Sequence, residues 1–586
     1  MIVKTLSKCI REYKKESILT PVYMAGEVFM EVAITYVLSL LIDRGITPGN
    51  MGEILRIGGL LILCALVSLA FGVMSGRSAA VASTGFAKNV RQDMYYNIQT
   101  FSFANIDRFS TASLITRLTT DVTRMQHAYM MLIRIAIRSP LMLIFSLIMS
   151  FRINARIATV FLCAVPVLGL GIYIMMSKAH PIYERVFKTY DKLNRVVQEN
   201  LRGIRVVKAF VREEHEREKF GKVSDTIYRD FSRAEKITTF GSPLMQASVY
   251  TCILLSSWLG AHIIVAGNMT TGQLMSVLTY AMSILTSLMM LSMVLMMLII
   301  SRASAERICE VLNERTDIAN DPGAETVIPD GSVDFDDVSF SYGGRGGRSC
   351  LENIDLHIRS GETIGLIGGT GSGKSTLVQL IPRLYDVTEG CVRVGGRDVR
   401  EYDIETLRNA VSMVLQKNEL FSGTIADNLR WGNEHATEEE LMEACRQACA
   451  DEFLARFPDG LNTHIEQGGT NVSGGQKQRL CIARALLKKP KILILDDSTS
   501  AVDTATDAKI RAAFAEKIPG TTVFIIAQRI SSVQDADRII VMENGQINGF
   551  GTHRELLDNN KIYREVYESQ TKGGGDFDQN SGGAQE

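Results

Sequence analysis

Six long apolar segments constrain the fold of this chain more than any other feature of its sequence. A helix needs roughly 20 apolar residues to cross the hydrocarbon core of a bilayer. Inside a bilayer, only structures that satisfy their own backbone hydrogen bonds are stable. The segments cover residues 18–41, 56–80, 128–151, 157–177, 244–266 and 272–300. They predict a bundle of six membrane-spanning helices.

The links between these segments predict the orientation of the bundle. Links 43–55, 152–156 and 267–271 are short, whereas links 81–127 and 178–243 are long, polar and helical in pattern. Lysine and arginine are concentrated in the long links and at the N-terminus, so these parts should lie in the cytoplasm. We therefore expect both termini to be cytoplasmic.

Residues 1–16 place basic side chains among Ile2, Leu6 and Ile10, a pattern typical of an amphipathic helix at a membrane surface. A signal peptide is the alternative. It is disfavoured because the charged stretch is long and no small-residue cleavage site follows. Without a targeting presequence, a bacterial inner membrane is the expected location.

Composition excludes some partners and cofactors. The net charge is −1, so a polyanionic partner such as nucleic acid is not expected. The ten cysteines are scattered, which argues against a disulfide framework. Cys445 and Cys449 are four apart on an expected helix, where buried small residues are favoured over a metal site.

The stretch TIGLIGGTGSGKST at residues 363–376 predicts a phosphate-binding loop. An apolar run indicates a buried strand, and a turn with the spacing G-x-x-x-x-G-K-S follows it. Glycines allow backbone N–H groups to close around phosphate oxygens, and the next helix points its N-terminus at the same anion. Lys374 is expected to reach the β- and γ-phosphates, and Ser375 to bind Mg²⁺. The predicted loop comprises Gly368, Gly369, Thr370, Gly371, Ser372, Gly373, Lys374, Ser375 and Thr376.

A second apolar strand, in KILILDDSTS at residues 491–500, ends at Asp496. A carboxylate at such a strand end is the second Mg²⁺ anchor of a P-loop nucleotide site, usually through water. From Ser332 onward, short apolar strands alternate with helices, which predicts an α/β domain.

The sequence VSGGQ at residues 472–476 precedes Lys477, Gln478 and Arg479 at an expected helix start. Phosphate loop, SGGQ signature and apolar-DD strand, in this order, resemble the nucleotide-binding domain of ATP-binding-cassette (ABC) proteins. With the six spans, residues 15–570 resemble an ABC exporter half-transporter of the multidrug type. The resemblance implies an α-helical six-span transmembrane domain plus an α/β P-loop domain. It also implies ATP and Mg²⁺ as cofactors, and an ATPase-coupled translocase that is active as a dimer.

The resemblance also implies roles for residues outside the loop. Tyr342 matches the aromatic residue that stacks on adenine, and Gln416 matches the glutamine that senses Mg²⁺ and couples to the membrane domain. The signature residues that would cap the γ-phosphate of ATP held by the opposite subunit are Ser473, Gly474, Gly475 and Gln476. Residues 466–468 resemble the loop that meets the coupling helices, and residues 500–503 resemble a loop along the dimer interface.

The expected division of the chain follows from these assignments. It comprises an interfacial helix (1–16), a transmembrane domain (17–305), a linker (306–330), a nucleotide-binding domain (331–571) and a disordered tail (572–586).

Two positions depart from the family pattern. Asp497 stands where the family has the glutamate that polarises the attacking water, and Gln528 stands where it has a histidine that touches the γ-phosphate. Aspartate withdraws the carboxylate by about 1.5 Å, and a misplacement of about 1 Å can cost roughly 100-fold in rate. Glutamine donates a hydrogen bond but carries no proton. Both changes predict a degenerate site that binds ATP, in a heterodimer whose other chain supplies the missing groups.

Other functions remain open. One is a nucleotide-gated channel or regulator, since some ABC proteins bind ATP without transporting. Another is a homodimeric lipid or peptide exporter. A soluble chromosome-handling ABC ATPase is excluded by the six spans, and an importer is disfavoured because importer membrane domains are usually separate chains.

Parts of the long links have mixed charge and helical apolar spacing, at residues 101–126 and 196–220. They are either solvated cytoplasmic helices or levers whose short turns contact a nucleotide-binding domain. We expect levers, and we expect one of them to contact the domain of the other subunit.

Four charged residues fall within the predicted spans. Glu27 and Glu31 share one face of the first span, and Arg134 and Arg138 share one face of the third. Because charges inside a membrane are usually paired, we expect at least one Glu–Arg pair. A structural role is favoured over substrate binding.

The last span carries methionines seven residues apart, an interval that returns to nearly the same helix face. They are Met275, Met282, Met289 and Met296. Methionine is frequent on promiscuous binding surfaces. The stripe either packs against helices and lipid or forms the wall of a cavity for hydrophobic or amphipathic, drug- or lipid-like compounds.

Overall fold

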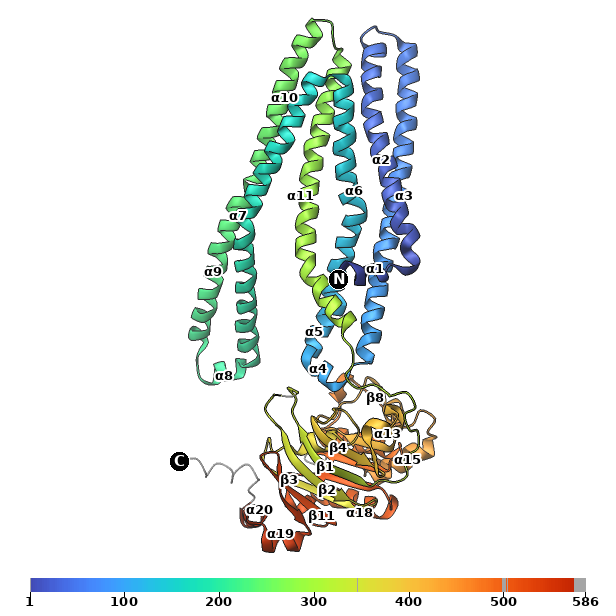
Figure 1. The fold of residues 1–586 in the computed structure, drawn as a ribbon, viewed down its shortest axis with the longest axis vertical. Coiled ribbons are helices and arrows are strands. Elements are labelled where there is room, and N and C mark those ends of the chain that lie inside the picture. Colours follow the sequence, from blue (N-terminus) through green and yellow to red (C-terminus); the bar gives the residue numbers. More distant parts are fainter. Residues whose placement is uncertain (1, 345, 498–501, 503, 574–586) are drawn as a thin grey trace. The chain divides into compact units, whose positions relative to one another are not determined.

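The structure, a computed structural model, describes residues 2–344, 346–497, 502 and 504–573 (Figure 1). It divides into two compact units. Unit 1 consists of Met1–Gln99 and Thr111–Glu314, and unit 2 consists of Thr100–Ser110 and Arg315–Glu586.

Unit 1 is entirely helical in its described residues. Its elements are α1 (Ile2–Lys8), η1 (Arg11–Tyr13), α2 (Lys14–Leu40), η2 (Leu41–Ile46), α3 (Met51–Gln99), α5 (Thr111–Thr116), η3 (Arg117–Asp121), α6 (Val122–Ile153), α7 (Ala155–Arg202), α8 (Ile204–Ala209), α9 (Glu213–Thr239), α10 (Gly241–Val265) and α11 (Thr271–Asn313). Six helical stretches are long and apolar enough to cross a membrane. They match the six predicted segments, so that prediction is confirmed.

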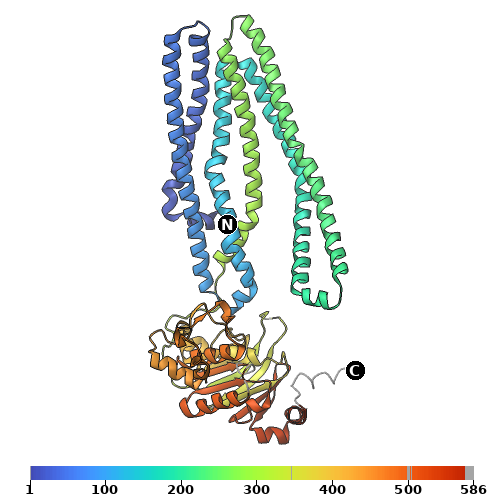
Figure 2. The ribbon, with the colours of Figure 1, turned by 180° about the vertical axis from the view of Figure 1, so that it is seen from behind.

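The helices extend well beyond the apolar segments. The second span continues in α3 through polar residues to Gln99, and the fourth continues in α7 to Arg202. Figure 2 shows α7 and α9 running side by side to a tip formed by α8. Tyr183 of α7 donates a hydrogen bond to Glu235 of α9 at 3.0 Å. The second long link is therefore a helical hairpin.

The N-terminal segment differs from the single helix that we expected. It forms α1 and η1, which are separated by a tight turn at Cys9 and Ile10. Asn89 of α3 donates to the carbonyl of Cys9 (3.0 Å), and Arg11 forms an ion pair with Asp93 (2.7 Å). A Cβ atom on Gly85 would lie 2.4 Å from the ring of Tyr13. The segment therefore packs closely along α3.

The first and last spans are joined near the short link 267–271. Asp43 accepts hydrogen bonds from the backbone N–H of Gly272 (2.9 Å) and the hydroxyl of Thr270 (2.6 Å), at the start of α11. A carboxylate at this position also interacts favourably with the positive end of the α11 helix dipole. Further along, the fully buried Tyr280 donates to the carbonyl of Val32 (2.8 Å).

Unit 2 is an α/β domain with three sheets. Its strands are β1 (Val333–Phe340), β2 (Leu351–Ile358), β3 (Thr363–Gly368), β4 (Glu389–Val394), β5 (Arg397–Asp398), β6 (Val411–Val414), β7 (Gly423–Thr424), β8 (His464–Ile465), β9 (Ile492–Asp496), β10 (Thr522–Ile526), β11 (Arg538–Glu543) and β12 (Gln546–Gly551). The six-stranded sheet has the order β12-β11-β3-β10-β9-β6, and the four-stranded sheet has the order β2-β1-β4-β5. The fold class predicted from the sequence is confirmed.

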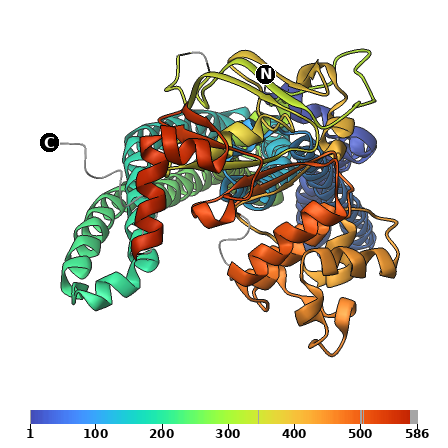
Figure 3. The same ribbon diagram turned by 90° about the horizontal axis from the view of Figure 1, so that it is seen from below.

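The helices of unit 2 pack around these sheets. They are α4 (Phe103–Phe109), α12 (Lys374–Gln379), η4 (Val399–Glu401), α13 (Ile404–Ala410), α14 (Ile425–Arg430), α15 (Glu438–Gln447), α16 (Asp451–Leu454), η5 (Gly460–Asn462), η6 (Gln467–Gly469), α17 (Gly474–Leu486), α18 (Thr504–Lys517), η7 (Ile530–Ser532), α19 (His553–Asn559) and α20 (Lys561–Gly573). Figure 3 shows α15–α17, in orange, gathered on one side of the unit and α19–α20, in dark red, on another.

The described boundaries differ from the expected ones in two places. Helix α11 continues to Asn313, well into the expected linker, because polar residues after the apolar span keep the helix hydrogen bonds. Residues 100–110 belong to unit 2, although they lie in a link of the transmembrane domain.

The parallel strands of the larger sheet bring the predicted motifs to one edge. Ile526 of β10 lies opposite Asp496 of β9 and Leu366 of β3. Ligands of such sheets bind beyond the carboxyl ends of the strands. The phosphate loop after β3, Asp497 after β9 and Gln528 after β10 therefore lie at the same edge.

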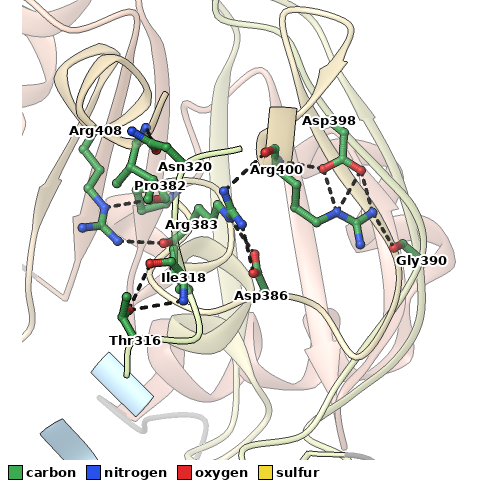
Figure 4. A network of polar contacts seen from close by, with 11 residues as sticks. Thr316, Ile318, Asn320, Pro382, Arg383, Asp386, Gly390, Asp398, Arg400 and Arg408 are labelled. Carbon is green, nitrogen blue, oxygen red and sulfur yellow. Dashed lines mark hydrogen bonds and ion pairs between the residues drawn. The ribbon is translucent and has the colours of Figure 1, made fainter. Parts of the chain in front are cut away.

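Figure 4 shows how the turn after α12 is held in place. Arg383 is 6% exposed and has φ +50°, a left-handed backbone conformation that is uncommon for residues other than glycine. Its guanidinium pairs with Asp386 at 2.8 Å, and its carbonyl accepts a hydrogen bond from Arg408 at 2.9 Å. The carbonyl of Arg400 accepts another bond from Arg383 at 3.4 Å. This network fixes a turn that also contains Tyr385.

Candidate nucleotide-binding site

The phosphate loop has the strand–loop–helix structure that the sequence predicted, between β3 and α12. Gly368 has φ +158°, and a Cβ atom there would lie 2.3 Å from the carbonyl oxygen of Met542. Gly371 has φ +80°, and a Cβ atom on it would meet open space. The hydroxyl of Ser372 is buried and has no hydrogen-bond partner among the described residues. Open backbone and an unsatisfied donor fit a loop that surrounds phosphate.

The basic side chain of the loop lies over its glycines. Lys374 donates to the carbonyls of Gly368 (2.7 Å) and Gly369 (2.8 Å). This holds the ammonium group above the loop, next to the N-terminus of α12. Both features favour an anion at this position. The residues present therefore fit the phosphates of a nucleotide.

The two predicted Mg²⁺ ligands are in contact. The hydroxyl of Ser375 donates to Oδ1 of Asp496 at 2.9 Å. Burial raises the pKa of Asp496 above its ordinary value, although the Ser375 hydrogen bond and the charge of Lys374 oppose this. A divalent cation would stabilise the buried carboxylate, and Mg²⁺ is commonly bound through few protein oxygens together with phosphates and water. The pair therefore fits a Mg²⁺ ion held with a nucleotide.

Gln416 is exposed two residues beyond β6 and forms no hydrogen bond with either Mg²⁺ ligand within the described residues. No group of three or more His, Cys, Asp or Glu side chains that could hold a metal occurs among the described residues. The donor set therefore remains Ser375 and Asp496, and the role of Gln416 stays a prediction.

Tyr342 lies beside the phosphate loop, as its expected role requires. Its hydroxyl is 3.1 Å from the hydroxyl of Thr376, and the residue is 51% exposed. The rings of Phe340 and Tyr385 meet it edge to face at 4.9 and 5.2 Å. Its position beside the loop and its open face fit stacking on a base.

The helix α4 packs on the same aromatic group. Tyr385 donates to Oδ2 of Asp107 at 2.7 Å, and the ring of Phe103 lies 5.9 Å from that of Tyr385. Burial, followed by the neighbouring Asp107, raises the pKa of Tyr385, so the phenol stays a donor at neutral pH. The link 101–126 therefore contains a short helix that contacts the nucleotide-binding domain of its own chain. This confirms the contact that we predicted for the first link, and its role as a lever stays a prediction.

Asp497 and Gln528, the two positions that we predicted to depart from the family pattern, contact each other. The side-chain nitrogen of Gln528 donates to Oδ2 of Asp497 at 3.1 Å. Asp497 has φ +49° and donates its backbone N–H to the carbonyl of Ile526 at 3.2 Å. The left-handed backbone directs its side chain to the loop after β10.

The signature forms the exposed N-terminus of α17. Ser473 caps this helix by accepting from the N–H of Gln476 (3.3 Å), and the side chain of Gln476 accepts from the N–H of Ser473 (2.9 Å). Ser473 and Gly474 are exposed and Gly475 is partly buried. A capped, exposed helix N-terminus can receive an anion from outside the chain. Of the expected interface loop at 500–503, only Val502 lies within the described residues.

A second candidate site lies within the membrane spans. Arg138 of α6 forms ion pairs with Glu27 (2.6 Å) and Glu31 (2.7 Å) of α2, which confirms the predicted pairing. The other oxygen of Glu27 is buried without a partner among the described residues. Arg134 forms no ion pair in the described part of the chain and lies beside Gly76 of α3.

A cavity of about 610 Å³ lies between α7 and α11. Its lining is mostly apolar and includes Tyr173, Met176, His180, Leu295 and Met296. Of the predicted methionine stripe, only Met296 lines this cavity. Met275, Met282 and Met289 are exposed on α11.

Sequence reasoning did not find Tyr385 or Asp107. Neither residue belongs to a motif, and they lie 278 positions apart. The cue available in the sequence was the proximity of Tyr385 to the phosphate-loop helix.

Comparison with known proteins agrees with this geometry. The family described as "ABC transporter transmembrane region" matches residues 19–300, and "ABC transporter" matches residues 351–500. The uncharacterized ABC transporter ATP-binding protein YfiB of Bacillus subtilis is 36% identical over 549 residues, covering 94% of this chain and 95% of the relative. The ATP-dependent lipid A-core flippase of Desulfotalea psychrophila is 32% identical, covering 82% and 84%.

A solved structure shows the same fold. The bacterial Atm1-family ABC exporter with ATP bound matches with a TM-score of 0.79 and 23% identity, covering 95% of this chain and 98% of that one. Both domains and their order are therefore shared along nearly the whole chain. The chain belongs to the ABC transporters, as a half-transporter in which a six-span transmembrane region and an ABC ATPase domain are fused in one polypeptide.

Proposed function

We propose that this chain is one subunit of an ATP-driven exporter of hydrophobic or amphipathic, drug- or lipid-like compounds. It works in a bacterial cell membrane, with both termini in the cytoplasm, and dimerises with a second half-transporter. The observation that carries the proposal is the phosphate and Mg²⁺ apparatus of Lys374, Ser375 and Asp496 in a chain with six membrane spans. ATP bound there would supply the free energy for closing the dimer.

The contact between Gln528 and Asp497 supports a site that holds ATP and hydrolyses it slowly. The Gln528 amide donates to the carboxylate, and an amide cannot take up the proton of an attacking water. The carboxylate also sits on a side chain one methylene shorter than glutamate. We assign to this site a binding role, and to the partner subunit the glutamate and histidine of the second site.

The exposed signature supports the complementary role. Ser473 and its neighbours at the N-terminus of α17 would cap the ATP held by the partner. The signature serine offers a hydroxyl, and the first turn of the helix offers backbone N–H groups to the γ-phosphate. In this arrangement, this chain contributes its signature to a site whose phosphate loop and catalytic groups belong to the partner.

The tip of the second hairpin supports coupling to the partner. Phe210 and Val211, next to α8, are 73% and 80% exposed, and Val211 has φ +52°, which is strained for a β-branched residue. Unit 2 has a hollow of about 330 Å³ whose lining includes Phe421 and Trp431, stacked at 4.2 Å. We assign the partner's tip to this hollow.

Charge complementarity supports the same docking. Glu213, Glu214 and Glu216 follow the tip, and the lining of the hollow includes three basic residues, Lys417, Arg484 and Lys488, against one acidic residue, Glu419. Disulfide crosslinking in the assembled dimer tests this contact. Cysteines at Phe210 and Trp431 should crosslink between subunits in the presence of a mild oxidant, whereas cysteines at Phe210 and Tyr342 should not.

The cavity between α7 and α11 supports an apolar substrate. Its apolar lining and flexible methionines can adapt to varied compounds. His180 and Tyr173 supply hydrogen-bonding groups at its wall. An amphipathic molecule could therefore place its apolar part against α11 and its polar part near His180.

One experiment tests the proposed function as a whole. The chain is purified alone and with a co-expressed second half-transporter, and ATP turnover is measured for both preparations. We expect turnover, and transport of a fluorescent amphiphile into inside-out vesicles, only from the co-expressed pair. Turnover by the single chain of roughly 1 s⁻¹ or more, the lower end of ordinary enzyme rates, would support the homodimeric alternative instead.

A further inference from the structure

The C-terminal helix α20 contacts the loop that carries Gln528. The side-chain oxygen of Gln570 accepts from the backbone N–H of Ile530 at 2.9 Å, and its side-chain nitrogen donates to the backbone carbonyl of Gln528 at 3.0 Å. One amide therefore bridges the backbone on both sides of Arg529. No sequence motif marks Gln570.

The helix that carries Gln570 is anchored independently of this contact. Tyr563 and Val566, on the same face of α20, are 0% and 2% exposed and belong to the main core of unit 2. The hydroxyl of Tyr563 lies 2.7 Å from Nδ1 of His553. Gln570 lies seven residues after Tyr563 and thus on nearly the same face. The core thereby sets the position of the bridging amide.

The bridged loop ends at the candidate site. Ala527 donates its N–H to the carbonyl of Leu366 and so still belongs to the sheet, and η7 begins at Ile530. Between these points, Gln570 holds the backbone from which Gln528 reaches Asp497 at 3.1 Å. The direction of the Gln528 side chain thus depends on a residue in the last described helix.

We propose that Gln570 is a positioning residue for the γ-phosphate end of the nucleotide site. It fixes the backbone at Gln528, and the Gln528 amide is thereby held where it can donate to Asp497 or to a terminal phosphate. This inference rests on the proposed ATP-binding role of the site, but not on whether the site hydrolyses ATP. The inference concerns recognition of the γ-phosphate of a nucleoside triphosphate.

Binding of two nucleotides to the full-length chain in detergent tests this inference. The probes are ADP and the non-hydrolysable triphosphate adenylyl imidodiphosphate, both with Mg²⁺. Gln570→Leu removes both hydrogen bonds, and Gln570→Glu keeps the acceptor for the Ile530 N–H but loses the donor to Gln528. Ser569→Ala, at the neighbouring position, is the matched control. Melting temperatures establish that each variant is folded.

We expect Gln570→Leu to weaken triphosphate binding about fivefold to tenfold, as the loss of two neutral hydrogen bonds allows. ADP binding should change less than about twofold, because ADP lacks the third phosphate. Gln570→Glu should fall between Gln570→Leu and the wild type, and Ser569→Ala should match the wild type. If Gln570→Leu does not fold, Gln570→Glu carries the test.

A double-mutant cycle separates positioning from general support. If Gln570 acts through Gln528, Gln570→Leu should add no further loss in a Gln528→Ala background. Additive losses, equal losses for ADP and the triphosphate, or no loss would each overturn the inference. A chain whose triphosphate binding is unchanged by Lys374→Ala would instead overturn the proposed ATP site.

Discussion

The amide nitrogen of Gln528 lies 3.1 Å from Oδ2 of Asp497. This hydrogen bond joins the residues that follow β10 and β9, two neighbouring parallel strands of the larger sheet. A neutral amide leaves the carboxylate charged and offers it no route for a proton. The contact therefore holds the two side chains in place without making either one a better base.

Asp497→Asn tests whether this carboxylate acts as a base. Asparagine retains an oxygen that can accept from Gln528, so the geometry should persist while the charge is lost. In the proposed heterodimer, where the partner's site would hydrolyse ATP, we expect turnover to change less than about twofold. A fall of about 100-fold, in the pair or in the chain alone, would identify Asp497 as the working base.

Ser473→Arg should have the opposite effect on the same pair. A long charged side chain at the N-cap of α17 would occupy the place of the partner's γ-phosphate and remove the capping hydroxyl. Turnover should fall at least about tenfold, within the range expected when a group that stabilises developing charge is lost. Ser349→Arg, in the same domain but outside the signature, is the control. Unchanged turnover in Ser473→Arg would contradict the assigned role of the signature.

The hydrogen bond between Tyr385 and Asp107 is expected to carry coupling between ATP binding and substrate. Tyr385→Phe keeps the ring contacts with Tyr342 and Phe103 but loses the donor. We expect ATP binding to stay within about twofold, whereas the stimulation of turnover by substrate falls at least about twofold, as for the loss of one hydrogen bond of ~1 kcal/mol. Asp107→Asn should weaken coupling less, because an amide oxygen still accepts. Equal stimulation in all three proteins would count against this route.

The intramembrane ion pairs predict a difference between two arginines. Arg138→Gln leaves Glu27 and Glu31 without their cation, and breaking a buried pair costs about 3–5 kcal/mol. Because Arg138 is 34% and Glu31 42% exposed, we expect a smaller loss of about 2–3 kcal/mol. The melting temperature of the purified chain should fall by about 3–5 °C, because the shift per kcal/mol is smaller for a large folded unit. Arg134→Gln, which breaks no ion pair of the described residues, should change it by less than about 2 °C.

The buried carboxylate of Asp496 is expected to lower the stability of the fold in a pH-dependent way, while it serves to bind Mg²⁺. Burial raises its folded-state pKa above the ordinary 3.8. At a pH above the folded-state pKa, the charged carboxylate therefore destabilises the fold. This penalty disappears as the pH falls through the folded-state pKa. Asp496→Asn should therefore melt above the wild type at neutral pH, and the difference should shrink toward about pH 4. The variant should also lose the stabilisation that Mg²⁺ and nucleotide give the wild type. A variant less stable than the wild type at neutral pH would contradict the assignment.

Local patterns predicted the parts of the site that are contiguous in sequence. The phosphate loop is read from the spacing of Gly368, Gly373 and Lys374, and Asp496 from the apolar strand before it. The six spans follow from hydrophobicity alone. Each of these signals lies within a short stretch, where chemistry and backbone geometry are set by neighbouring residues.

The contacts that the sequence did not predict join distant segments or depend on where helices end. Tyr385 meets Asp107 two residues after a turn at Arg383 with φ +50°. The expected N-terminal helix divides at Arg11, which has φ +42°. None of these features has a signature in the residue pattern.

The assignment of residues 100–110 to unit 2 matters for any attempt to exchange parts between transporters. The chain crosses between its two units three times, after Gln99, after Ser110 and after Glu314. A catalytic domain grafted from Arg315 onward would leave α4 behind and uncover the face of Tyr385 that Phe103 and Asp107 occupy. A chimaera that carries residues 100–110 together with its nucleotide-binding domain would keep the contacts of Tyr385 with α4. The boundaries for such an exchange therefore lie inside the first long link as well as after the last span.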